Sequence, residues 1–235
     1  MFHPVIEMTA QMLAERRTRA LRDVAARSIK AETVEDACTL VVQALAAYEL
    51  DVPFALIYRL NVDGDSARLV ASAGLLKDLP ASPQRIEIDS IHAHSWPLSD
   101  VVRSGQAQLV EDLKRRFGEF SCGPYPERPR AALLLPLTPP GSERPAAVLV
   151  AGISGRLKLN PPYRDFYDLL ASAATGALAT GHGFEQERKR AEPLTELDRA
   201  KTAFFSNVAV KIEMSVGTKI ACARFASCAR NRARH

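Results

Sequence analysis

The chain has 235 residues, of which 47% are hydrophobic and 25% charged, a composition that fits a globular domain with extensions and excludes global disorder. Its net charge of +4 is unevenly placed: residues 209–235 carry six basic and one acidic side chain, and residues 1–208 carry 25 basic and 26 acidic ones. No apolar run approaches the roughly 20 residues of a membrane helix. With no leader pattern and four irregularly spaced cysteines, we expect a cytoplasmic protein that contacts no membrane and has neither a disulfide framework nor a zinc site.

Helical periodicity opens the chain. Residues 8–28 place Leu13, Ala20, Leu21 and Val24 on a narrow apolar seam. Such a seam suits either a contact between the helices of two chains or packing on the chain's own domain. Both alternatives stay open at the level of sequence.

A second helix is predicted to begin at Thr33, whose side chain is expected to cap it. Strand patterns follow this helix. Residues 54–61 alternate in polarity, and residues 68–72 return after the turn at Asp63-Gly64, which predicts an antiparallel hairpin. Further strands are predicted at 107–110, 131–135 and 146–153.

A long helix is predicted after Asn160, which can cap it. Its expected apolar face comprises Phe166, Leu169, Leu170, Ala173, Ala177, Leu178 and Phe184. Beyond Phe184 the sequence is polar on nearly all sides, as in a helix that leaves its domain, and Pro193 should break or kink it. The element order predicts an α+β fold, with an antiparallel sheet flanked by helices and long helices at both ends.

This element order and several sequence segments resemble the GAF family. The hairpin at 54–72 is similar to the first two GAF strands, residues 96–113 to the family's helix, turn and third strand, and residues 131–153 to its last strand pair. The resemblance implies a GAF domain over residues 30–183, preceded by a signalling helix at 1–29.

A second resemblance is more specific. Residues 196–208 read ELDRAKTAFFSNV, nearly verbatim the approach to the phosphoacceptor box of bacterial sensor histidine kinases, which continues SHEFRTPL. The resemblance implies that residues 184–208 are an exiting helix and the start of a kinase dimerisation region. Val210 stands where the phosphorylated histidine belongs. We therefore expect no enzymatic activity from this chain, because phosphotransfer needs an imidazole nucleophile and a nucleotide site.

Residues 209–235 match no part of the kinase family and form a divergent basic tail. Its bias towards alanine, arginine and cysteine suggests a frame-shifted end of a GC-rich gene, a hypothesis that sequencing of the locus would test. Its positive charge is weak evidence for nucleic-acid binding, since Phe225 is its sole aromatic residue. We expect no nucleic-acid partner.

A GAF pocket lies between the sheet and the segment that covers it, so the middle of the chain supplies the candidate ligand-binding residues. These are Trp96, Glu111, Asp112, Cys122 and Tyr125. The alternative is that Trp96 belongs to the core and the two acids to surface turns. The ligand and any cofactor stay unknown, because neither the bilin-attaching pair nor the cyclic-nucleotide signature of GAF domains is recognisable.

His92 and His94 could place two imidazoles on one side of a strand, but no third ligand is evident, so no metal site is expected. The resemblance implies the sensory portion of a two-component kinase that forms a homodimer through its terminal helices. The alternatives are a stand-alone ligand-binding or dimerisation module and a GAF-fold methionine sulfoxide reductase. The reductase would need a reactive thiolate at Cys122.

Overall fold

The computed structural model describes residues 3–76, 79–89 and 95–191, with no account of side chains before residue 10. It divides into two compact units, residues 1–185 and 186–235. In the second unit, the described residues 186–191 are helical. The kinase-like segment at 196–208, Pro193 and the basic tail lie outside the described residues.

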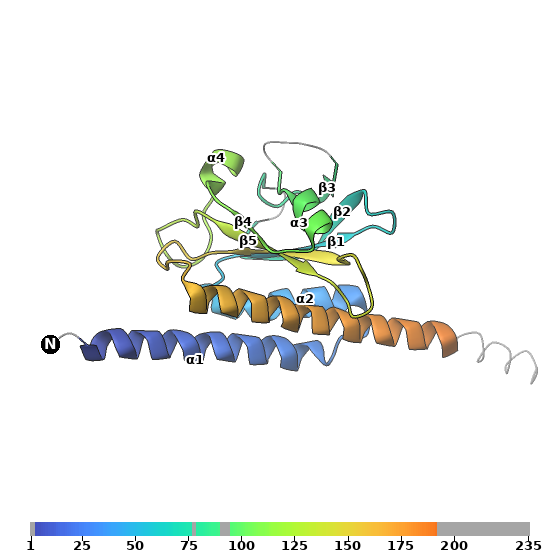
Figure 1. The fold of residues 1–235 in the computed structure, drawn as a ribbon, viewed down its shortest axis with the longest axis horizontal. Coiled ribbons are helices and arrows are strands. Elements are labelled where there is room, and N and C mark those ends of the chain that lie inside the picture. Colours follow the sequence, from blue (N-terminus) through green and yellow to red (C-terminus); the bar gives the residue numbers. More distant parts are fainter. Residues whose placement is uncertain (1–2, 77–78, 90–94, 192–235) are drawn as a thin grey trace, which may run out of the picture. The chain divides into compact units, whose positions relative to one another are not determined.

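The first unit is an α+β fold, as predicted (Figure 1). Its elements in chain order are α1 (His3–Ser28), α2 (Val34–Leu45), η1 (Ala46–Tyr48), β1 (Ala55–Leu60), β2 (Ser66–Ala73), β3 (Arg85–Glu87), α3 (Leu98–Ser104), β4 (Gln108–Val110), α4 (Leu113–Phe117), β5 (Ala132–Leu137) and β6 (Ala147–Gly152). A helix at 161–185, here called the last helix, completes the unit. Of these elements, β3 and α4 were not predicted from the sequence.

The six strands form one sheet in the order β3-β2-β1-β6-β5-β4, and every pairing is antiparallel. The strand pair predicted from residues 131–153 includes β6, which lies inside the sheet and is buried along its whole length. Side chains of successive residues point to opposite faces of a strand. Accordingly, Ala55 and Ile57 belong to one hydrophobic cluster, and Leu56 and Tyr58 belong to the other.

Three helices cover one face of the sheet. Figure 1 shows α2 and the last helix against the sheet, with α1 packed on their outer side. The Thr33 hydroxyl accepts a hydrogen bond from the backbone N–H of Asp36 at 3.0 Å, which confirms the predicted cap of α2. Asn160 caps the last helix in the same way, since its Oδ1 accepts from the N–H of Tyr163 at 3.1 Å.

The apolar seam of α1 is used within the chain. Ala20 and Val24 are buried in the same cluster as α2 and the last helix, and Leu21 packs against that cluster. Of the two alternatives left open by the sequence, the structure shows packing on the chain's own domain. On the last helix, by contrast, Leu169 and Phe184 are 56% and 49% exposed, so these two residues lie outside the buried face predicted for them.

The opposite face of the sheet is covered by α3, α4 and the loops that connect them (Figure 1). Glycine ends α3: Gly105 takes the left-handed conformation, and its N–H bonds to the carbonyl of Val101. Among the described helices, none combines the length and apolar character that crossing a bilayer requires.

Candidate ligand-binding site

The segment between β4 and β5 builds a groove of about 550 Å³ on the loop-covered face. Asp112 lies between β4 and α4, directly before the first residue of α4. It is the one described non-glycine residue with a positive φ, at 53°. Aspartate tolerates this left-handed conformation better than most residues. The turn directs the chain into α4, and the backbone N–H of Leu113 bonds back to the carbonyl of Arg130 at 3.2 Å. This bond joins the two walls of the groove.

Charged side chains dominate the rim of the groove. Glu119 pairs with Lys114 and with Arg128, each at 2.6 Å, so it bridges α4 and the loop at 126–130. Hydrogen bonds from Lys114 and Arg128 lower the pKa of Glu119 to about 2. Asp112 and Arg130 also line the groove, with both side chains exposed.

The apolar part of the groove belongs to the loop-side core. Leu113 is fully buried, and Phe120 is half-buried with its ring in edge contact with Phe54 at 6.0 Å between centroids. An apolar base with charges of both signs around it suits a small polar or zwitterionic molecule.

Trp96 lies in the core and does not line the groove. It is 2% exposed, its Nε1 donates to the carbonyl of Ala81 at 2.8 Å, and its ring centroid lies 4.4 Å from that of Phe117. This placement agrees with the alternative that Trp96 belongs to the core. Its ring packs against that of Phe117, the last residue of α4.

The two predicted acids are placed differently from each other. Asp112 lines the groove, whereas Glu111 is exposed beside it and is absent from its lining. Tyr125 is half-buried at the margin, where the guanidinium of Arg156 lies 4.1 Å from its ring centroid. Arg156 in turn pairs with Glu127, a lining residue, at 2.6 Å.

Cys122 is buried in the cluster that contains Trp96, and burial raises its pKa to about 12. Cys38 is buried in the cluster on the other side of the sheet, and burial raises its pKa to about 12 as well. Both thiols are therefore protonated at neutral pH, whereas the thiolate is the reactive form. Their positions on opposite faces also keep the two sulfur atoms from acting as a nucleophile and its resolving partner.

The structure thus brings Asp112 to the groove, places Tyr125 at its margin and assigns Trp96 to the core. Sequence reasoning missed the ion-paired residues Lys114, Glu119 and Arg128, and also Arg130. A signal was available, because residues 111–130 carry an unusual density of both charges. No group of three metal-binding side chains occurs within the part of the chain that the structure describes. His92 and His94 lie outside that part.

No family model matches the sequence, and no curated protein matches it. Several solved structures, however, are similar to this chain. A protein from Burkholderia vietnamiensis described as a GAF sensor gives a TM-score of 0.52 at 12% identity, covering 72% of this chain and 98% of its own. The free methionine-R-sulfoxide reductase from Neisseria meningitidis, solved with its substrate, gives 0.53 at 14%, covering 72% and 92%. The GAF domain of an Acinetobacter phosphoenolpyruvate-protein phosphotransferase gives 0.50 at 19%, covering 70% and 93%.

These similarities define the class of fold. The antiparallel six-stranded sheet with helices on one face and a loop-rich segment on the other is a GAF fold, as the sequence resemblance predicted. The identities are below 25%, so the likeness concerns the fold alone. The three chains include a sensor, an enzyme and a domain of a phosphotransferase, and function must be argued from this chain's own residues.

Proposed function

We propose that residues 30–183 are a cytoplasmic sensory module that binds a small polar molecule in the groove between Asp112 and Arg130. The observation that carries this proposal is the groove itself, in which an apolar base meets exposed charges of both signs. A carboxylate or phosphate group would pair with Arg130, and an amino or hydroxyl group would donate to Asp112.

Native mass spectrometry of the purified full chain tests this function. We expect a retained small-molecule mass that disappears in Arg130→Gln, because the substitution removes an exposed guanidinium that takes part in no ion pair among the described residues. Arg164→Gln is the matched control, since Arg164 is equally exposed but lies on the last helix, away from the groove. Retention of the same mass by Arg130→Gln would reject the groove as the binding site.

We further propose that the module belongs to a sensor of the histidine kinase type. The support is the near-verbatim ELDRAKTAFFSNV at 196–208. We propose that this chain is itself not an enzyme, because Val210 occupies the phosphoacceptor position. Incubation with labelled ATP should give no acid-labile phosphoprotein, and appearance of one would refute this point.

The proposed homodimer through the terminal helices needs an exposed surface. Ala20 and Val24 of the α1 seam are buried within the chain, whereas Leu169 on the last helix is 56% exposed. Light scattering should therefore give a dimer mass for the full chain and a monomer mass for Leu169→Glu. A monomer mass for the unmodified chain would contradict dimerisation.

A further inference from the structure

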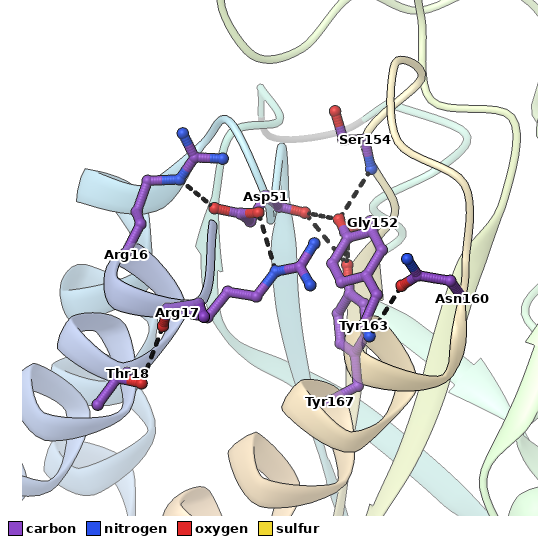
Figure 2. A network of polar contacts seen from close by, with 10 residues as sticks. Arg16, Arg17, Thr18, Asp51, Gly152, Ser154, Asn160, Tyr163 and Tyr167 are labelled. Atoms are coloured by element: carbon purple, nitrogen blue, oxygen red, sulfur yellow. Dashed lines mark hydrogen bonds and ion pairs between the residues drawn. The ribbon is translucent and has the colours of Figure 1, made fainter. Parts of the chain in front are cut away.

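Asp51 lies in the turn before β1, on the helix-covered side of the domain, and its side chain binds α1 (Figure 2). The side chain is 2% exposed. One carboxylate oxygen accepts a hydrogen bond from Nε of Arg16, and the other accepts from Nε of Arg17 at 3.2 Å. The carboxylate raises the pKa of the Arg16 guanidinium by hydrogen bonding. A buried carboxylate is thus compensated by two arginines of a single helix.

The backbone carbonyl of Asp51 binds the last helix. It accepts a hydrogen bond from the hydroxyl of Tyr163. The single hydroxyl proton of Tyr167 is shared between the carbonyl of Gly152 at 2.8 Å and that of Asp51 at 3.2 Å. Burial raises the pKa of both tyrosines, so both hydroxyls stay protonated and able to donate. Figure 2 shows the two tyrosines and the two arginines on opposite sides of Asp51.

Arg17 closes this network into a ring. Its guanidinium carbon lies 3.9 Å from the centroid of the Tyr163 ring, a cation–π contact between α1 and the last helix. A second tether runs through Tyr48, whose hydroxyl donates to Asp23 of α1 and whose carbonyl accepts from the N–H of Asp51 at 3.0 Å. The turn at Asp51 is therefore held from both helices at once.

We propose that Asp51 is a latch that couples the docking of α1 to the position of the last helix. The Asp51 carboxylate would be left buried without its two partners if α1 moved away, and an unpaired buried charge is strongly unfavourable. Displacement of Tyr163 and Tyr167 would release the carbonyl of Asp51 and so loosen the turn that carries the carboxylate. As a switching element must, the latch would separate two discrete arrangements of α1, docked as seen here and released.

This role goes beyond ligand binding, because no residue of the latch lines the groove. The turn that carries Asp51 does lie beside Gly123, close to Tyr125 at the groove margin. The latch provides a connection between the N-terminal helix and the last helix that does not pass through the groove. Coupling of this kind is reciprocal, so a change at either helix should appear at the other.

Hydrogen–deuterium exchange of the full chain, measured by peptide, tests the latch. In Tyr163→Phe/Tyr167→Phe both rings remain and two hydroxyls are lost. We expect exchange of the amides at 10–28 in α1 to rise roughly tenfold. The lost hydrogen bonds involve no group of α1, so this rise would have to pass through Asp51. Tyr58→Phe is the matched control: Tyr58 is buried and its hydroxyl donates to the carbonyl of Pro83 at 3.1 Å, on the loop-covered side. It should leave α1 unchanged.

Coupling from α1 to the last helix is tested with Arg17→Met. This variant keeps the aliphatic part of the side chain and alters no residue of the last helix. Exchange at 161–170 should rise severalfold while that of β5 and β6 stays constant. This variant also decides the question if the double tyrosine variant does not fold. Unchanged exchange at 161–170 in Arg17→Met, or an equal rise of α1 exchange in Tyr58→Phe, would overturn the latch.

Discussion

The two faces of the sheet are covered in different ways. On the helix-covered face, three helices bury a large cluster. Asp51 links α1 to Tyr163 of the last helix, and the N–H of Val34 in α2 donates to Glu185 of the last helix at 2.9 Å. On the loop-covered face, the short helices α3 and α4 and their loops bury a smaller cluster around Trp96 and leave a charged groove above it. One face is covered by packed helices, and the other carries exposed charged side chains around a groove.

Under the proposed function, this difference would let one small domain separate recognition from transmission. Loops that carry function are usually positioned by a rigid scaffold. Here the sheet is that scaffold for the groove, while the same strands contribute the opposite side chains to the helical core. The following predictions test whether the two faces are as independent as their packing indicates.

The largest effect is expected on the loop-covered face, from Trp96→Ala. Removal of this buried ring should lower the free energy of unfolding by about 4 kcal/mol, because it leaves a cavity against Phe54 and Phe117 and an unpaired carbonyl at Ala81. Urea unfolding measures the loss. The conservative Trp96→Phe should lose clearly less. If the faces are independent, exchange of α1 relative to the other helices stays constant in both variants.

A smaller effect is expected where the helices meet most closely. A Cβ at Gly181 would lie 2.3 Å from the carbonyl oxygen of Thr33, at the cap of α2. Gly181→Ala should therefore lower the free energy of unfolding by about 2 kcal/mol, since the last helix must shift away from α2. Thermal unfolding followed by circular dichroism measures this.

Gly176→Ala on the same helix is the matched control, because a Cβ there meets no atom within 4 Å. It should stabilise the protein by about 0.5–1 kcal/mol through the higher helix propensity of alanine. Equal effects of the two substitutions would show that the contact between the last helix and α2 is not as tight as described.

Periodicity and capping predicted the helices of the helix-covered face, but they wrongly placed Leu169 and Phe184 on the buried side of the last helix. Thr33, Asn160 and the alternation at 54–61 are local signals, and each was confirmed. The Asp51 network could not be predicted, because its partners are 34 to 116 residues away in sequence and no local pattern marks a buried carboxylate. The groove was predicted only at Asp112, since a polar rim depends on how loops fold and not on hydrophobic periodicity. The β3 strand was missed because three residues give too little alternation.

The smallest effect should come from the rim of the groove. Glu119 has its pKa lowered from 4.5 to about 2 by Lys114 and Arg128. Because the folded pKa lies below the unfolded one, the contribution of Glu119 to stability is fully present above about pH 4.5 and is lost as the pH falls to about 2. The melting temperature of Glu119→Gln should therefore lie slightly below that of the unmodified protein at neutral pH, and the two curves should converge in acid.

Glu49→Gln is the control for that comparison, because Glu49 is exposed and takes part in no ion pair among the described residues. The substitution therefore removes a carboxylate without breaking a pair. The expected shift is small because exposed ion pairs are screened by water and salt. A difference between Glu119→Gln and the unmodified protein that persisted below pH 2 would show that Glu119 acts through packing and not through charge. In that case the loop at 126–130 would be held by shape, and the rim would be as firmly built as the opposite face.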